Sequence, residues 1–450
     1  MRGVRGLTLL LVCACATPAV PDARRVREPS APSLRAHPAR PPGCRDVPAG
    51  GALQPWLDGA HEGDALCLAP GEHLGPAHVA TRLMLWGPPK AVLRTRAPGV
   101  LLRVTGSGAH VLGFTIDAAG GRFDREDAAM RIEGDDVIVE GIEITEATFG
   151  ILVDKSRRLQ LRGNRILGAR SVITGLRGDA IRLWETRDSV LEHNEIAWAR
   201  DIVIWYSPHN VVRHNRISHS RYGTHFMYSG DNVFADNHVE SCVVGLFVMY
   251  SRGIHVTRNR LVDASGAAGM GVGLKESGNI TLQDNLFVHD SIGLYIDTSP
   301  LYLGDVNRIE RNRFRLSGTA VTFHGRSNGN TFVGNELAGN RKQVDVEGGG
   351  DARESHWAEN WFDDYVGYDL DDDGVGDVPY TLRSLSGQLT ARFPQAQYFH
   401  GSPALAIVEA ISSLVPLVTP RTLIVDQRPR TTAPRASAAS VPTPEGSHAG

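Results

Sequence analysis

Two methionines and a histidine in the middle of the chain have the residue types of a soft metal site. Met227 and Met249 occupy the same place in two similar segments, 223–229 and 245–251, and His225 lies two residues before Met227. Thioether sulfur and imidazole nitrogen suit Cu(I). If the segments stack as neighbouring strands, the two methionines lie about 4.8 Å apart. We therefore predict a copper site at His225, Met227 and Met249. The alternative is a methionine surface that only packs under a loop or a partner.

Aromatic residues occupy neighbouring places in the same set of segments. Exposed aromatic side chains are unusual on a solvated sheet face, so we predict a contact surface there. Its residues are Trp184, Trp205, Tyr206, Tyr228 and Tyr250. The alternative is an exported polysaccharide-binding or polysaccharide-cleaving protein, in which the two tryptophans stack on sugars. Such proteins place carboxylates beside a base, and a polar cluster of Asp179, Arg182 and Glu185 would resemble that arrangement.

An acidic stretch near the C-terminus resembles a calcium-binding loop. Asp369, Asp371, Asp373 and Asp377 stand at positions 1, 3, 5 and 9 of an EF-hand-type loop, with a glycine at position 6. Position 12, normally a glutamate, is Tyr380. We therefore predict calcium binding that is weaker than in a complete loop. The alternative is an acidic turn that is ordered without metal.

The elements that must position these residues form a repeat. Seven-residue segments with aliphatic second and fourth places recur from residue 150 to residue 299. Alternation of β-branched and aromatic residues between Gly, Asn and Ser indicates short strands and tight turns. A repeat of about 22 residues with this pattern predicts a parallel β-helix with short capping helices.

A column of asparagines accompanies the repeat, each followed two residues later by an apolar side chain. We expect these asparagines to adopt the left-handed turn conformation and to hydrogen-bond the asparagines of the coils above and below. They are Asn164, Asn194, Asn215, Asn237, Asn259, Asn285, Asn312 and Asn335.

The N-terminus has the pattern of an exported protein. Residues 1–16 combine arginines with a short apolar run, as in a secretory signal peptide. Cys15 lies in a lipobox-like sequence, although an ordinary small-residue cleavage site also fits. In an oxidising compartment Cys44 and Cys67 can form a disulfide that staples the first coil. The net charge of −3 argues against a nucleic-acid partner.

The remaining boundaries follow from composition. Residues 17–43 form a Pro-rich linker, 44–346 the β-helix, and 347–400 a C-terminal cap that contains the acidic loop. A short helix near residues 53–57 would cover the open first coil. Residues 401–429 form an apolar docking segment, too short to cross a bilayer, and 430–450 a disordered tail.

These segments together resemble a known family. The coils at 223–229, 245–251 and 271–277, the aromatic segment 360–365 leading into 369–380, and the ending 402–429 are similar to NosD, the maturation protein of nitrous oxide reductase. The resemblance covers roughly residues 45 to 430. It implies a periplasmic, right-handed parallel β-helix that is not itself an enzyme. Such proteins work with an ABC transporter permease and ATPase and with a copper-chaperone lipoprotein, and together they supply the copper-sulfur centre of nitrous oxide reductase. The lipobox-like start leaves soluble and lipid-anchored forms as alternatives.

Overall fold

The computed structural model describes residues 37–384, with gaps at 96, 120, 171–172 and 348–350, and residues 420–434. Between these ranges it also describes the single positions 395, 402, 403, 407 and 411. The predicted signal peptide and most of the linker lie outside the described residues. So does most of the apolar segment that we expected to dock on a partner.

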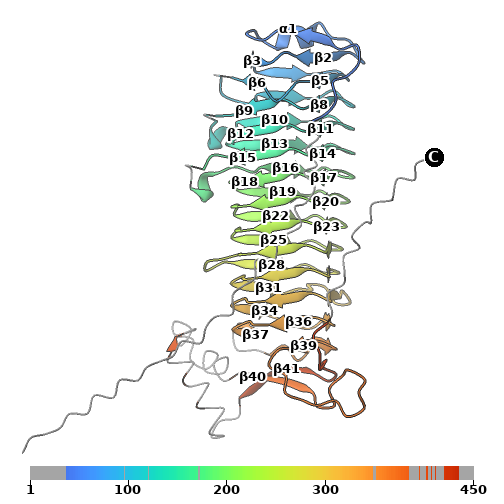
Figure 1. Cartoon of the computed structure of the whole chain (residues 1–450), viewed down its shortest axis with the longest axis vertical. Helices are drawn as coiled ribbons and strands as arrows, with labels where there is room; N and C mark the ends of the chain where they lie inside the picture. The colour runs from blue at the N-terminus through green and yellow to red at the C-terminus, as the bar shows by residue number, and fades with distance from the viewer. Residues whose placement is uncertain are drawn as a thin grey trace, which may run out of the picture. The chain divides into compact units, whose positions relative to one another are not determined.

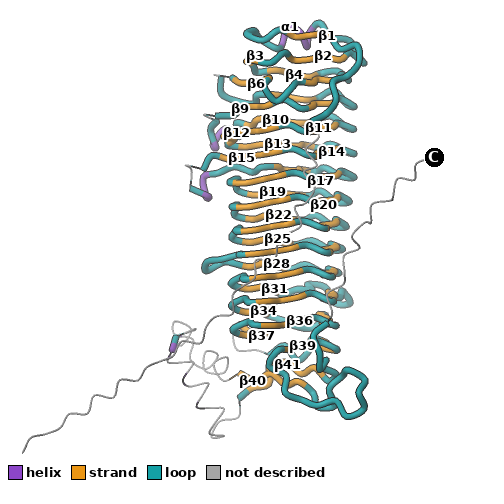
Figure 2. Tube along the Cα trace, viewed as in Figure 1, coloured by secondary structure: helices purple, strands orange, loops and turns teal. Residues whose placement is uncertain are grey.

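The described chain winds through three parallel sheets, one strand per sheet in each coil (Figures 1 and 2). The first sheet contains β1 (Arg45–Val47), β2 (Ala65–Leu68), β5 (Met84–Trp86), β8 (His110–Leu112), β11 (Ile138–Glu140), β14 (Gln160–Arg162), β17 (Val190–Glu192), β20 (Val211–Arg213), β23 (Val233–Ala235), β26 (His255–Thr257), β29 (Thr281–Gln283), β32 (Asn307–Glu310), β35 (Asn330–Val333) and β38 (His356–Ala358). The second contains β3 (Gly71–Leu74), β6 (Ala91–Arg94), β9 (Thr115–Asp117), β12 (Glu143–Ala147), β15 (Arg165–Gly168), β18 (Glu195–Ala197), β21 (Arg216–Ser218), β24 (His238–Glu240), β27 (Arg260–Val262), β30 (Leu286–Val288), β33 (Arg313–Arg315), β36 (Glu336–Ala338) and β39 (Trp361–Phe362).

The third sheet carries the seven-residue segments of the repeat. Its strands are β4 (Ala77–Val79), β7 (Leu102–Val104), β10 (Ala128–Ile132), β13 (Phe149–Asp154), β16 (Ile181–Trp184), β19 (Asp201–Trp205), β22 (Tyr222–Met227), β25 (Val244–Met249), β28 (Met270–Lys275), β31 (Ile292–Asp297), β34 (Thr319–His324) and β37 (Lys342–Glu347). This arrangement confirms the predicted parallel β-helix. The aliphatic second and fourth places point into the coil, as in the fully buried Leu246 and Val248 of β25.

The asparagine column forms a hydrogen-bonded ladder inside the coils. The side chain of Asn164 donates to Asn194, that of Asn194 to Asn215, and so on through Asn335 to Asn360, at 2.9–3.1 Å. The expected left-handed conformation is wrong for these residues. It belongs to the residue before each of them, for example His193 (φ 55°) and His214 (φ 54°). The preceding residue turns the corner with its side chain outward, which leaves the asparagine amide to face inward.

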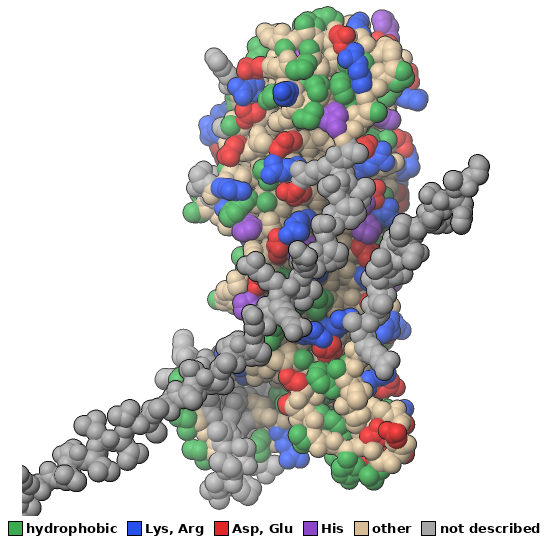
Figure 3. All heavy atoms as spheres, viewed as in Figure 1, with side chains coloured by type: hydrophobic (Ala, Val, Ile, Leu, Met, Phe, Trp, Pro, Cys, Tyr) green, Lys and Arg blue, Asp and Glu red, His purple; other side chains and the backbone are tan. Residues whose placement is uncertain are grey.

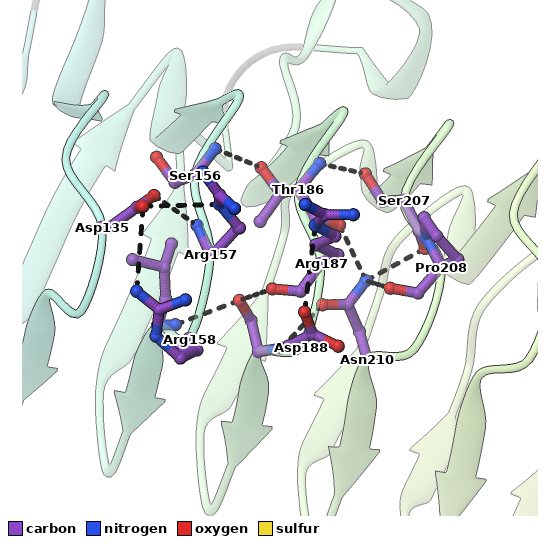
Figure 4. Close-up of polar contacts among 12 residues, drawn as sticks. Asp135, Ser156, Arg157, Arg158, Thr186, Arg187, Asp188, Ser207, Pro208 and Asn210 are labelled. Atoms are coloured by element: carbon purple, nitrogen blue, oxygen red, sulfur yellow. Dashed lines mark hydrogen bonds and ion pairs between the residues drawn. The ribbon is translucent and has the colours of Figure 1, made fainter.

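A second corner is joined by hydroxyl groups. The backbone N–H of Ser156 donates to Thr186, that of Thr186 to Ser207, and that of Ser207 to Ser229 (Figure 4). The last place of every segment is Ser or Thr because this corner needs a short hydroxyl side chain that accepts from the adjacent coil. These ladders fix the register of the strands, and therefore the alignment of outward side chains on the third sheet.

Both ends of the described solenoid are covered. At the first coil, α1 (Gln54–Asp58) contacts β4, and a disulfide joins Cys44 to Cys67. Two further one-turn helices, η1 (Phe123–Arg125) and η2 (Thr174–Leu176), lie in loops. Every helix among the described residues is too short or too polar to serve as a membrane span.

The C-terminal boundaries differ from those expected. The β-helix does not end at residue 346, because β38 and β39 pair with β35 and β36 and complete one more coil. Within the segment assigned to docking, residues 421–426 form β41 (Arg421–Asp426), antiparallel to β40 (Tyr380–Ser384). The tail assigned from residue 430 also begins later, since the backbone N–H of Arg430 donates to Asn360. Strand β41 was missed because its partner, β40, lies outside the repeat and far away in sequence.

Candidate metal centre

The predicted copper ligands lie on adjacent strands of the third sheet, facing outward. Met227 of β22 is the register partner of Met249 of β25, and His225 is the partner of Phe247. Both methionine side chains are partly exposed, whereas His225 is 9% exposed. In-register parallel pairing puts like places about 4.8 Å apart, so two thioethers from neighbouring coils share one small area of the sheet.

His225 already faces one of the sulfurs. Its Nε2 lies 3.2 Å from Sδ of Met249. Burial, which outweighs the opposing charge of Asp201 and acts together with Arg221 and Arg200, lowers the pKa of His225 to about 4. The imidazole is therefore neutral near pH 7, which is the state in which it can donate a nitrogen lone pair to a metal ion.

Aromatic rings border the two methionines on one side. Tyr206, Tyr228 and Tyr250 stack in consecutive coils, with centroids 5.2 and 4.8 Å apart. Trp184 and Trp205 meet edge to face at 4.8 Å, and Trp205 is the register partner of Met227. The structure thus brings the five predicted contact residues together beside the candidate ligands. Tyr206 and Tyr228 are more than 40% exposed, so these two rings present area to solvent or to a partner.

An ion pair borders the methionines in the next coils. Lys275, the register partner of Met249, lies 3.3 Å from Asp297. Along the stacked strands, Trp205 therefore lies on one side of the two methionines, and the Lys275–Asp297 ion pair lies on the other. Between Trp205 and this ion pair, the candidate ligands are the thioethers of Met227 and Met249 and the imidazole of His225. This ligand set suits Cu(I) better than harder divalent ions.

Three residues of this area were not predicted. Tyr222 and Met270 each lie one residue before the glycine that begins their seven-residue segment. The aligned segments did not include this place, but the paired strands do. Phe247 lies against both: a Cβ on Gly273 would lie 2.6 Å from its ring and 2.8 Å from the Met270 sulfur. Gly273 thus leaves room for this ring and this thioether. Extending the aligned segments by one residue would have found Tyr222 and Met270.

The acidic loop gathers three of its four predicted carboxylates. Ligand atoms of Asp369, Asp371 and Asp373 lie within 4.8 Å of one another. The carboxylate of Asp377 instead accepts from the backbone N–H of Leu370 at 2.7 Å. Repulsion from Asp373 raises the pKa of Asp371. Tyr380 is buried, stacks on a core ring and donates to Asp364, so its side chain is not available at position 12.

The polar residues considered for sugar cleavage pair with different partners. Arg182 forms two hydrogen bonds with Glu126 at 2.8 and 2.9 Å, and Asp179 pairs with Arg200 at 2.8 Å. Glu185 accepts from the Trp184 indole instead. Burial raises the pKa of Asp179 to about 6. Because its carboxylate and the Arg182 guanidinium each have another partner, they do not form the expected single cluster.

Comparison with known proteins agrees with this architecture. Residues 168–366, which include every candidate copper ligand, match the family described as periplasmic copper-binding protein (NosD). By this match and by two relatives, the chain is similar to the NosD family. A Pseudomonas aeruginosa protein named probable ABC transporter binding protein NosD is 28% identical over 377 residues, covering 78% of this chain and 84% of its own. A NosD of the same description from Stutzerimonas stutzeri is 26% identical over 370 residues, covering 78% and 83%.

Solved structures share the fold at low sequence identity. The catalytic unit of an α-1,3-glucanase from Streptomyces thermodiastaticus has a TM-score of 0.50 at 15% identity, over 71% of this chain and 70% of its own. An exopolygalacturonase from Yersinia enterocolitica has a TM-score of 0.50 at 10% identity, over 65% and 74%. At such identities the likeness concerns the β-helix alone, which both NosD proteins and sugar-cleaving enzymes use.

Proposed function

We propose that this protein is a periplasmic Cu(I)-binding accessory protein and not an enzyme. It holds one Cu(I) ion between His225, Met227 and Met249 on the outer face of the third sheet. The observation that carries this proposal is the 3.2 Å approach of the His225 Nε2 to the Met249 sulfur, with Met227 in register beside it. The match of residues 168–366 to a family described as copper-binding and periplasmic supports it.

The site's position supports transfer rather than storage of the ion. The methionines are partly exposed on a flat sheet face, so a second protein can approach the same ion from outside. The exposed Tyr206 and Tyr228 beside them offer contact area for such a partner. Thioethers do not titrate, and a neutral imidazole needs no deprotonation before it binds the metal.

The partners we propose follow from the family. Two relatives are named as ABC transporter binding proteins, so we propose that this chain associates with an ABC transporter permease and ATPase. It receives copper from a copper-chaperone lipoprotein and helps to assemble the copper-sulfur centre of nitrous oxide reductase. Co-purification of the tagged full chain with the permease tests the association. Recovery of the chain without the permease from membranes that contain it would contradict it.

The copper proposal is tested by titrating the exported chain with Cu(I) against a competing chelator. The double variant Met227→Leu, Met249→Leu keeps side-chain volume and removes both sulfurs. The matched control is Met84→Leu, the same change on β5 of the first sheet. We expect one tightly bound ion in the wild type and in the control, and at least a tenfold loss of affinity in the double variant.

Two outcomes would contradict the copper proposal. Equal affinity in the double variant would move the ion to other ligands. An absence of stoichiometric binding in the wild type would remove the carrier role and return attention to an acidic-glycan ligand for the aromatic face. Binding of uronate oligosaccharides, measured on the same preparation, would then be the deciding measurement.

A further inference from the structure

The imidazole of His225 is held between two aromatic rings. The Tyr222 ring meets it nearly perpendicular, with centroids 5.2 Å apart and 78° between the planes. The Phe247 ring lies on another side at 5.7 Å and 23°. Tyr222 and Phe247 also contact each other at 5.4 Å, so the three rings form one packed group. Rotation of the His225 side chain away from Met249 would require a neighbouring ring to move.

Tyr222 is itself fixed by an ion pair whose carboxylate is buried. Asp201, 1% exposed at the start of β19, accepts from the Tyr222 backbone N–H at 3.0 Å and from Nε of Arg221 at 3.1 Å. The Arg221 guanidinium lies 4.3 Å from the centroid of the Tyr222 ring. The pairing of β19 with β22 shifts register between Asp201 and Val203, which breaks the regular alternation next to the candidate site.

This local network has no role in the repeat itself. Neighbouring coils pair at the Tyr222 position through Val244 and Met270, neither of which carries a ring. The Asp201–Arg221 pair ties this coil to the one before it, as Asp179–Arg200 does one coil earlier, but only the Arg221 pair adjoins the Tyr222 ring. The contacts of this network run step by step from Asp201 and Arg221 to Tyr222, from Tyr222 to the His225 ring, and from His225 to the Met249 sulfur.

We propose that Tyr222, held by Arg221 and Asp201, is the positioning residue of the copper site. It fixes the His225 ring with Nε2 directed at the Met249 sulfur before any metal arrives. This inference rests on the proposed function. A pre-organised side chain avoids the free-energy cost of ordering on binding, which for one side chain amounts to roughly threefold to tenfold in affinity. The phenol hydroxyl has no part in this role; the ring does.

The test compares two substitutions at one position. Tyr222→Leu removes the ring, and Tyr222→Phe keeps it. We expect Tyr222→Leu to bind Cu(I) roughly threefold to tenfold more weakly than the wild type. X-ray absorption of the Cu(I)-loaded protein should show that Tyr222→Leu keeps its sulfur ligands and loses or weakens the nitrogen ligand. Tyr222→Phe should match the wild type in both measurements.

A metal-free measurement separates this inference from the copper proposal. In the wild type and in Tyr222→Phe, NMR should show a nuclear Overhauser effect between the His225 ring and the labelled Met249 methyl group. Tyr222→Leu should lose it. Persistence of that contact in Tyr222→Leu would overturn the positioning role, whether or not the protein binds copper. Unchanged Cu(I) affinity and an unchanged nitrogen ligand in Tyr222→Leu would overturn it also, while leaving the copper proposal intact.

A second variant guards against a general folding defect. Phe247→Leu removes the other ring and leaves Tyr222 and its charge pair unsubstituted. We expect it to loosen the same His225–Met249 contact while thermal unfolding of both leucine variants stays cooperative. Two results together would count against the positioning role of Tyr222. The first is that Tyr222→Leu loses both the His225–Met249 contact and cooperative unfolding. The second is that a folded Phe247→Leu keeps the contact.

Discussion

Asp290 is a single carboxyl group buried in the core of the solenoid. It is 2% exposed, its Oδ1 accepts from the backbone N–H of Ala264 at 2.8 Å, and its Oδ2 has no hydrogen-bond partner. Burial raises its pKa well above the ordinary value. A raised folded-state pKa contributes stability below the unfolded pKa of about 3.9, and this contribution is lost as the pH rises through the folded pKa.

Replacing this carboxyl group with an amide should therefore stabilise the protein at neutral pH. Asn340 occupies the equivalent corner of a later coil and donates to the Phe314 carbonyl at 2.9 Å, so an asparagine fits there. We expect Asp290→Asn to raise the free energy of unfolding by about 1–3 kcal/mol near pH 7, because it removes a buried unsatisfied acceptor. The gain should shrink toward about pH 4, as measured by denaturant unfolding at both values.

Asp305→Asn is the matched comparison for this prediction. Asp305 is also buried, but it pairs with Arg252 at 2.5 Å and accepts from Asn279 at 2.9 Å. Its neutral amide would leave the guanidinium without its counter-charge, so the same substitution should destabilise the protein. If both variants shifted stability in the same direction, the lack of an ion-pair partner at Asp290 would not explain its effect.

Sequence reasoning at the residue scale identified the candidate ligands and missed the residues that pack around them. Met227, Met249 and His225 stand at repeating places, so the strand period alone predicts their alignment. Tyr222 was missed because its role depends on a ring contact and on a buried carboxylate one coil earlier, neither of which has a sequence period. The turn conformation was assigned one residue too late for a related reason: an inward amide and an outward corner are adjacent in sequence and differ only in geometry.

At the scale of elements, β41 closes the asparagine ladder. The last amide, that of Asn360, donates to Asp426 Oδ2 at 2.9 Å, and the backbone N–H of Asn360 donates to the same oxygen at 3.1 Å. Asp426 is fully buried. The ladder was predictable from the spacing of its asparagines, but its end was not. Asp426 lies 66 residues after Asn360 and belongs to the antiparallel strand β41, which is not part of the repeat.

Removal of the Asp426 carboxylate should destabilise the last coils. Asp426→Ala leaves the buried backbone N–H of Asn360 without its acceptor, which costs about 1–3 kcal/mol, while the side-chain amide keeps the carbonyls of Phe332 and Ala358. Asp426→Asn keeps one acceptor oxygen and should cost less. Denaturant unfolding gives the total effect, and amide hydrogen exchange at Asn360 localises it. Slow exchange at Asn360 in Asp426→Ala would show that other groups close the ladder.

The acidic loop is an element whose calcium affinity can be predicted from what it lacks. Three carboxylates converge, and the position normally taken by a bidentate glutamate is a buried tyrosine. We expect Ca²⁺ to bind with a dissociation constant on the order of 10⁻⁴–10⁻³ M, the range of weak sites. Calorimetric titration with Ca²⁺ should give heat that is lost in Asp371→Asn, Asp373→Asn. Equal heat in that variant, or none in the wild type, would leave an acidic turn without metal.

At the scale of the whole molecule, the described coils contact mainly their neighbours. Stability in such an array is approximately a sum of terms for each repeat and each interface between repeats. Charged side chains of both signs are interspersed along the face shown in Figure 3, in keeping with the net charge of −3. A local change should therefore have local effects, in contrast to a globular core.

The N-terminal disulfide gives a test of this independence. Cys44→Ser, Cys67→Ser opens a cross-link between residues 23 apart, which should lower the free energy of unfolding of the first coils by about 2–4 kcal/mol. Hydrogen exchange should become faster in β1 and β2. The affinity for Cu(I) at β22 and β25 should not change, because many coils lie between. A parallel loss of copper affinity would reveal coupling along the axis that the contacts do not predict.

The asparagine ladder has a direction. Each side-chain amide accepts from the coil before and donates to the coil after, so all the amide dipoles along the column point the same way, with their positive ends toward the C-terminal coils. Their effects add, as peptide dipoles do along a helix. Asp426 places a carboxyl group, which can only accept when ionised, at the positive end of this row. A neutral donor there would meet another donor, so the polarity of one column of amides determines which kind of side chain can end the fold.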